Sequence, residues 1–209
     1  MHATLFYIHD PMCSWCYAFE KNLFALRQAL PAEVQVINLV GGLAPDTIET
    51  MPKSLQQTIQ QIWHRIEQTV SGVKFNHNFW TTNTPMRSTY PACRAVLAAK
   101  KQHFDAEQLM IHAIQTAYYQ QAKNPSLAAT LIQCALDIGL DVTEFERDLI
   151  SSEIEAQLQQ EINMVQSMRV KSYPSLCLQN DGQLSNIEID YLDHRTMLNE
   201  IAKLHSFFD

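Results

Sequence analysis

The chain begins with a short apolar segment and then changes to helical periodicity. Residues 4–8 form an apolar and β-branched run that stops before Asp10-Pro11, which is typical of a buried strand. Apolar side chains then recur every three or four positions from Phe19 to Leu30, which predicts a helix. Residues 34–40 are apolar on both faces of a second predicted strand. This pattern favours a central place in the sheet.

The middle of the chain, from residue 45 to residue 168, is predicted to be almost entirely helical. Its clearest apolar stripe, at i, i+3, i+4 and i+7 spacing, consists of Ile59, Ile62, Trp63, Ile66 and Val70. Asp46 and Glu49 have the spacing of a capping box. Residues 73–86 are predicted to form a polar and aromatic loop that contains His77. Loops of this length often bind ligands, although packing is the stronger interpretation for this histidine.

The pattern changes again near the C-terminus. Tyr173-Pro174 precedes a short apolar run at residues 175–178, and Asn180-Asp181-Gly182 is a strong signal for a hairpin turn. Residues 184–189 then have the pattern of a returning strand, and a final amphipathic helix follows it. Without the helical block, the order is strand, helix, strand, followed by strand, strand, helix.

This order predicts an α/β protein whose sheet-containing part is interrupted by an all-helical insertion. Residues 1–44 and 152–209 are expected to form the sheet-containing domain, and residues 45–151 the inserted helical domain. The length of 209 residues and the hydrophobic content of 46% suit one large domain with such an insertion.

Charge and hydropathy argue against nucleic acid and membranes as partners. A formal net charge of −7 without any basic run argues against nucleic acid as a partner. No apolar run approaches the roughly 18 residues that a membrane span requires, so no membrane association is expected. The start at Met1, without a signal-like segment, favours a cytoplasmic protein over a mature secreted one. These features leave the oligomeric state open.

The strongest chemical signal is the pair of thiols in Cys13-Ser14-Trp15-Cys16, where the first strand meets the first helix. With this spacing, Cys13 is expected to attack a partner disulfide and Cys16 to resolve the mixed disulfide. Positive partial charge at the helix N-terminus favours the thiolate of the first cysteine. The alternatives are an inert buried pair and one half of a zinc site. Because Cys93, Cys134 and Cys177 are isolated in the sequence, we expect no metal and interpret these three as core residues.

Two neighbours of the thiols are further candidates. Asp10 is expected either to cap the first helix or to act as a carboxylate that relays protons to the buried thiol. Trp15 is expected to contact substrate or shield the disulfide, with simple packing as an equal alternative.

Five stretches, in this order along the chain, resemble one known family. They are residues 10–16 (DPMCSWC), 39–43 (LVGGL), 91–96 (PACRAV), 117–119 (AYY) and 170–176 (VKSYPSL). The chain thus resembles the DsbA-like branch of the thioredoxin superfamily. It is most similar to predicted disulfide oxidoreductases related to 2-hydroxychromene-2-carboxylate isomerases and kappa-class glutathione transferases.

The resemblance implies a thioredoxin fold with a helical insertion, in which a cis Pro174 faces the cysteine pair. Tyr173 and Pro174 would then bind an extended substrate, and their loop would keep a metal from bridging the sulfurs. Two departures qualify the comparison. Ser14-Trp15 lacks the histidine found between the cysteines of strong oxidants, and Arg169 occupies a position where the family often has glycine.

Three functional hypotheses follow. The leading one is a disulfide oxidoreductase or isomerase acting on proteins or small thiols, without a bound cofactor. The second is a glutathione-dependent isomerase or transferase, in which glutathione is reductant or co-substrate and Cys13 or Ser14 assists at its sulfur. The third is a non-enzymatic, redox-dependent binding module. The reduction potential separates a reductant, near about −270 mV, from an oxidant, near about −120 mV.

Overall fold

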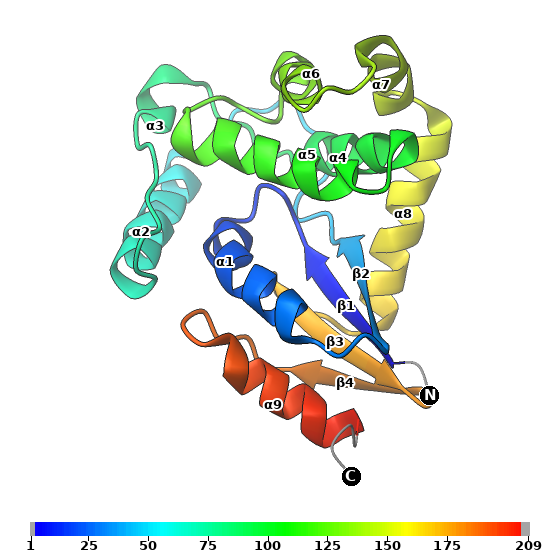
Figure 1. Ribbon diagram of the computed structural model, residues 1–209. Helices are drawn as coiled ribbons and strands as arrows, with labels where there is room; N and C mark the ends of the chain where they lie inside the picture. The colour runs from blue at the N-terminus through cyan, green and yellow to red at the C-terminus, as the bar shows by residue number, and fades with distance from the viewer. Residues whose placement is uncertain (1–2, 206–209) are drawn as a thin grey trace.

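The computed structural model describes residues 3–205 and contains one four-stranded sheet (Figure 1). Its strands are β1 (Ala3–His9), β2 (Val34–Val40), β3 (Ser175–Asn180) and β4 (Gln183–Ile187), in the order β2-β1-β3-β4. β1 runs parallel to β2, whereas β3 is antiparallel to both β1 and β4. This is the sheet of a thioredoxin fold, as the element order predicts.

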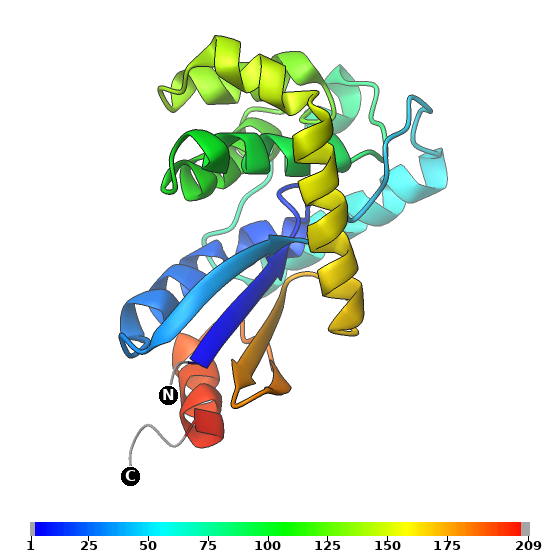
Figure 2. The same cartoon turned by 90° about the vertical axis from the view of Figure 1, so that its right-hand side faces the viewer.

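Helices cover both faces of this sheet. α1 (Ser14–Ala29) and α9 (His194–His205) pack on one face, and α8 (Ser152–Ser167) packs on the other. Successive side chains of β1 point to opposite faces: Leu5 contributes to the core beneath α1 and α9, and Phe6 to the core beneath α8. Figure 2 shows α8 running from the helical block down along the sheet.

The expected central position of the second strand is wrong, because β2 lies at an edge of the sheet. Its apolar pattern has another cause: both of its faces are covered, Val34 by the α1 side and Leu39 by the α8 side. A side chain of α8 also provides a hydrogen-bond acceptor for a backbone donor of β2: the Val40 N–H donates to Glu161 Oε2 at 2.8 Å. A helix can therefore provide the burial that a neighbouring strand would otherwise give.

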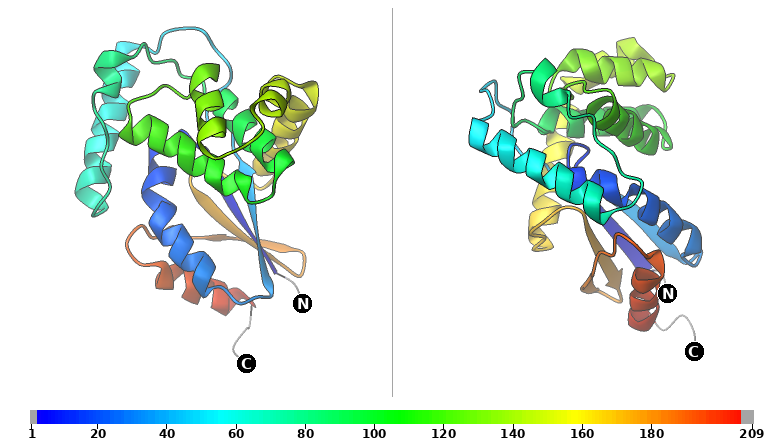
Figure 3. Two further views of the ribbon diagram at one scale, coloured as in Figure 1. Left: turned by 45° about the horizontal axis from the view of Figure 1, so that its top comes forward. Right: turned by 90° about the vertical axis from the view of Figure 1, so that its left-hand side faces the viewer.

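The middle of the chain is helical, as expected. It contains α2 (Lys53–Thr69), α3 (Phe79–Thr82), α4 (Tyr90–Gln102), α5 (Ala106–Gln115), the π-helix η1 (Thr116–Gln120), α6 (Ala128–Asp137) and α7 (Val142–Leu149). These helices lie over the end of the sheet at which β1 and β2 finish, and α2 lies alongside α1 (Figures 1 and 3). No helix within residues 3–205 combines the length and apolar composition that crossing a membrane requires.

Two local expectations in this block need correction. The capping box at Asp46 is wrong, because α2 begins only at Lys53 and Asp46 instead forms an ion pair with Arg94 at 2.7 Å. The loop at residues 73–86 includes the short helix α3. The division into residues 1–44 with 152–209 and residues 45–151 stays a prediction. Met12 and Val40, from the sheet-containing part, share one continuous core with the helical block.

Candidate functional site

The two thiols lie where β1 leads into α1. Cys13 is the N-cap of α1, and its Sγ accepts a hydrogen bond from the Cys16 N–H at 3.4 Å. The turn before the helix is closed by the Cys13 N–H, which donates to the Asp10 carbonyl at 3.0 Å. Cys13 is 7% exposed, whereas Cys16 is completely buried. Cys13 is therefore the more accessible of the two sulfurs, and both cysteines are free thiols.

A loop from the other end of the chain faces Cys13. The Tyr173–Pro174 peptide bond is cis, as the resemblance implies. The Cys13 thiol donates to the Tyr173 carbonyl oxygen at 3.5 Å. The Tyr173 hydroxyl in turn donates to the Gly41 carbonyl at 2.8 Å, and a Cβ at Gly41 would overlap the tyrosine ring. The glycine after β2 thus makes room for the aromatic ring that anchors this loop.

Burial distinguishes the second thiol chemically. Desolvation raises the pKa of the Cys16 thiol well above its usual range, and the hydrogen bond and charge of Cys13 raise it further. Cys16 is therefore held in its protonated form in the resting dithiol. It becomes a nucleophile only if a neighbouring group accepts its proton.

Asp10 is a buried carboxylate that joins three segments of the chain. Oδ1 accepts from the Met12 N–H at 2.8 Å, and Oδ2 accepts from the Leu43 N–H at 2.8 Å and the Thr89 hydroxyl at 2.6 Å. The Cys93 thiol also donates to Oδ2, at 3.5 Å. Burial raises the pKa of Asp10, although these donors act in the opposite direction.

The contacts of Asp10 exclude one of its two predicted roles, which were helix cap and proton relay. The side chain that caps α1 is Cys13, so the interpretation of Asp10 as the helix cap is wrong. Asp10 instead bonds to the turn before the helix. Its proton-relay role stays a prediction, and the carboxylate is near enough for its charge to raise the pKa of Cys16.

A cavity of about 790 Å³ lies beside the loop that carries Tyr173 and Pro174. Trp15, Tyr173 and Pro174 contribute to its wall, although Pro174 itself is buried. The half-buried Trp15 ring packs against Tyr191, with ring centroids 4.8 Å apart. The structure thus brings the three predicted substrate-binding residues to one surface next to Cys13.

The cavity also carries positive charge that the sequence did not indicate. Arg65 comes from α2, and its guanidinium carbon is 6.0 Å from the centroid of the Trp15 ring. Arg169 and Lys171 come from the segment between α8 and β3. No ion pair in the described part of the chain involves any of these cations.

The remaining cysteines differ in their relation to the site. Cys134 and Cys177 are core residues, and the Cys177 thiol donates to Asn186 Oδ1 at 3.2 Å. Cys93 is also buried, but it contacts Asp10 and so belongs to the surroundings of the Cys13–Cys16 pair. Sequence reasoning missed this link and the one to Thr89. The available signal was that Cys93 belongs to one of the five stretches of the resemblance.

His9 makes a pH dependence of stability expected. Its ring is buried and stacked on Tyr7 at 5.0 Å, and within residues 3–205 neither nitrogen has a hydrogen-bond partner. Burial, with smaller effects of Arg27 and Lys100, lowers its pKa to about 3. Between pH 6.5 and about pH 3, His9 is protonated in the unfolded chain but stays neutral in the folded chain. Stability contributed by this group is therefore complete above that pH and is lost as the pH falls toward 3.

Between pH 7 and pH 5, the free energy of unfolding is expected to fall by about 2 kcal/mol because of His9. Urea unfolding of the wild type and the His9→Leu variant at both pH values measures the effect. Because the variant lacks the histidine, its free energy of unfolding should fall by about 2 kcal/mol less than that of the wild type between the two pH values. An equal fall in both proteins contradicts the assignment.

A pair of cysteines at a helix N-terminus, facing a cis-proline loop on a sheet of this topology, defines a thioredoxin-fold protein. The helical insertion places it with the DsbA-like members of that class. A family model described as thioredoxin matches residues 6–199. The chain belongs to this family.

Comparison with solved structures gives the same fold. A candidate protein disulfide isomerase from Nitrosomonas europaea has a TM-score of 0.86 at 24% identity, covering 98% of this chain and 100% of that one. The cytosolic disulfide reductase DsbM from Pseudomonas aeruginosa has a TM-score of 0.75 at 24% identity, covering 96% and 99%. A structure of DsbM with GSH has a TM-score of 0.74 at 20% identity, covering 96% and 98%.

One curated relative is named as an adapter protein and not as a disulfide isomerase or reductase. The ClpXP adapter protein SpxH of Halalkalibacterium halodurans is 25% identical over 183 residues, which cover 83% of this chain. The match covers 57% of that relative, so the chain spans little more than half of its length.

Proposed function

We propose that the protein is a thiol–disulfide oxidoreductase in which Cys13 is the nucleophile and Cys16 the resolving thiol. The observation that carries this proposal is the asymmetry of the pair. Cys13 lies at the N-terminus of α1, is 7% exposed and is 3.5 Å from the Tyr173 carbonyl, while Cys16 is completely buried. One sulfur is placed to meet the substrate, and the other is kept from solvent until it is needed.

In the reducing direction, the Cys13 thiolate attacks one sulfur of a substrate disulfide. The substrate S–S bond breaks, its other sulfur leaves as a thiolate, and a mixed disulfide with Cys13 remains. Cys16 then loses its proton and attacks Cys13 Sγ, which releases the second substrate thiol and leaves a Cys13–Cys16 disulfide. Two electrons have passed from the pair to the substrate. The oxidising direction is the reverse of these steps.

The surrounding residues position this exchange. Cys13 Sγ accepts from the Cys16 N–H at the N-terminus of α1, and its thiol donates to the Tyr173 carbonyl. Asp10 is the buried group proposed to take the Cys16 proton. The backbone of Tyr173 is available to pair with an extended substrate segment beside Cys13.

The proposal is tested by turnover of a protein disulfide. The reduced full chain should reduce insulin repeatedly when a reductant regenerates the dithiol. A binding module has a specific observation in its favour, because the SpxH relative is named an adapter. That role predicts a redox-dependent complex with a partner protein and no turnover, so the absence of turnover would reject the enzyme and favour the module.

Glutathione is the small thiol that we propose for the cavity. Glutathione carries carboxylates at both ends, and the cavity offers Arg65, Arg169 and Lys171, which form no ion pair with another described residue. A volume of about 790 Å³ is in the range of small-molecule sites. Arg169 also adopts a φ of +58°, a left-handed conformation that favours glycine. The strained arginine lines the cavity, which is consistent with a use for its charge there.

Arg169→Gly is therefore expected to separate binding from stability. The KM for glutathione should rise by roughly tenfold, the equivalent of about 1.4 kcal/mol of lost interaction. The free energy of unfolding should stay the same or rise by up to about 1 kcal/mol, because the left-handed strain is relieved. Steady-state kinetics and urea unfolding measure the two effects.

Lys203→Glu, an exposed charge change on α9 away from the cavity, is the matched control and should alter neither quantity. An unchanged KM for glutathione in Arg169→Gly would reject this binding site. That result would not bear on disulfide exchange with protein substrates, which the insulin assay tests. The glutathione site and the oxidoreductase activity can therefore be rejected independently. Tight glutathione binding without any disulfide exchange would favour the isomerase or transferase alternative.

A further inference from the structure

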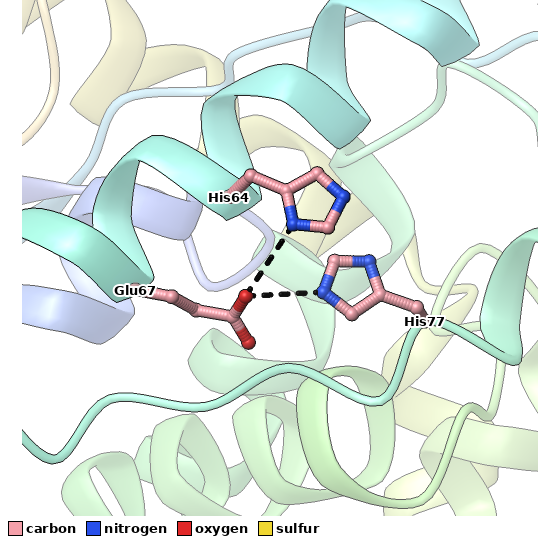
Figure 4. Close-up of side chains that lie close together, drawn as sticks. All are labelled: His64, Glu67 and His77. Atoms are coloured by element: carbon pink, nitrogen blue, oxygen red, sulfur yellow. Dashed lines mark hydrogen bonds and ion pairs between the residues drawn. The ribbon is translucent and has the colours of Figure 1, made fainter.

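A cluster of metal-binding side chains lies away from the thiols, where α2 meets the following loop. His64 and Glu67 are three residues apart and therefore lie on the same side of α2. His77 reaches them from the loop at residues 73–86 (Figure 4). Glu67 Oε2 lies 3.6 Å from His64 Nδ1 and 3.3 Å from His77 Nε2. Nothing in the redox chemistry uses these residues.

The spacing of the three groups suits a metal ion. Zinc binds histidine nitrogen and carboxylate oxygen at about 2.0–2.2 Å, so neighbouring ligand atoms in a tetrahedral site lie about 3.3–3.6 Å apart. Both distances to Glu67 Oε2 have this value. All three candidate ligand atoms lie within 4.8 Å of one another. The His64 and His77 rings are stacked with centroids 4.4 Å apart, and each places one nitrogen near the same Glu67 oxygen.

Two of the ligands are already positioned by other contacts. The second oxygen of Glu67, Oε1, accepts from the Phe75 N–H at 2.9 Å, which ties the loop to α2. The His77 ring packs edge-on against the buried Trp63 at 5.7 Å. Supporting contacts of this kind orient the ligating side chains in metal sites.

Exposure indicates the form that such a site would take. The side chains of His64, Glu67 and His77 are 62%, 17% and 33% exposed, so the cluster opens to solvent on one side. Two histidines and one glutamate with an open position form the ligand set of zinc sites that keep a water or exchangeable ligand. Imidazole ligands favour zinc and related transition metals over magnesium or calcium, which prefer oxygen.

We propose that His64, Glu67 and His77 bind one zinc ion, or a similar divalent transition-metal ion, with a coordination position left for water or an external ligand. The ion would link the loop at residues 73–86 to α2. Because α2 also carries Arg65, which lies over Trp15, the metal would stiffen one wall of the cavity beside Cys13. The alternative is a simple Glu67–His77 ion pair that needs no metal. This inference does not depend on the proposed redox function.

Zinc titration of the full chain by calorimetry tests the site. The protein carries Cys13→Ser and Cys16→Ser, so that the active thiols do not compete for zinc; Cys93, Cys134 and Cys177 are buried. One zinc ion should bind per chain. Replacing His64 or His77 with glutamine should weaken binding by at least about tenfold.

The matched control is His112→Gln. His112 also pairs with a glutamate, Glu20, at 2.8 Å, but it belongs to no group of three metal-binding side chains among the described residues. Zinc affinity should be unchanged in this variant. In the same proteins, zinc should raise the melting temperature of the parent and the His112 variant but not that of His77→Gln.

Either of two results would overturn the proposal. One is zinc binding that His77→Gln does not weaken, and the other is no saturable binding by the parent protein. Cobalt as a substitute ion gives an independent check. A thiolate-to-cobalt charge-transfer band in this background would assign the metal to the remaining cysteines and also reject the site.

Discussion

Replacing Cys13 with serine is expected to reduce dithiol exchange to the uncatalysed background. A serine hydroxyl at the N-cap of α1 is a far weaker nucleophile toward a disulfide than the sulfur of Cys13, and it cannot form the mixed disulfide. Reduction of insulin by the full chain, with the reductant in excess, measures the loss. Cys134→Ala, which changes a buried thiol in α6, is the control and should retain turnover.

The companion variant, Cys16→Ser, is expected to stop the same reaction one step later. Cys13 still attacks the substrate disulfide, but no second thiol resolves the product, so a mixed disulfide accumulates. Non-reducing electrophoresis and mass spectrometry detect this species, with the substrate attached at Cys13. If Cys13→Ser reduces insulin at the parental rate, or if Cys16→Ser turns over without a mixed disulfide, the assigned roles are wrong.

Replacing Asp10 with alanine is expected to lower the free energy of unfolding by about 2–5 kcal/mol. The change leaves the buried N–H groups of Met12 and Leu43 without their acceptor, and each unsatisfied buried donor costs about 1–3 kcal/mol. The Thr89 hydroxyl and Cys93 thiol lose the same partner. Release of a buried charge offsets part of the loss. Urea unfolding of the reduced protein at pH 7 measures the difference.

Two further variants make this result specific. Asp46→Ala removes an exposed carboxylate paired with Arg94 and should cost less than about 1 kcal/mol. Asp10→Asn keeps one carbonyl acceptor and should be less damaging than Asp10→Ala. Because burial raises the pKa of Asp10, the folded chain holds this proton more tightly than the unfolded chain. Stability from the group is therefore complete below the unfolded value of 3.8 and is lost as the pH rises through the folded pKa.

The Asn variant also separates a proton relay from a purely structural role. A relay predicts slower resolution of the mixed disulfide by Cys16, with no change in the first attack by Cys13. Stopped-flow measurement of the two steps as a function of pH shows which one responds. Stability equal to wild type in Asp10→Ala, within about 0.5 kcal/mol, would contradict the structural assignment.

The elements of the sheet were accessible to sequence reasoning because their signals are local. The hairpin signal Asn180-Asp181-Gly182 lies at the turn between β3 and β4. The position of β2 was not accessible, since an edge strand covered by α8 has the same apolar pattern as a central strand. The capping box at Asp46 failed for a related reason: a distant arginine, Arg94, competes for that carboxylate.

The sequence by itself determined the cysteine pair, its place between a strand and a helix, and the order of elements around it. These features depend on residues a few positions apart, for which spacing and periodicity are sufficient. Its resemblance to a known family added the cis proline opposite the thiols.

Only the tertiary structure decided which residues surround that pair. Asp10 accepts hydrogen bonds from Leu43, Thr89 and Cys93. The positively charged side chains of the cavity come from α2 and from the segment before β3. His77 meets His64 and Glu67 in the same way, across a loop. Such contacts join segments that are far apart along the chain, and they arise from packing of the helical block on the sheet. No local pattern encodes them, because each partner is chosen by burial and charge in the folded protein.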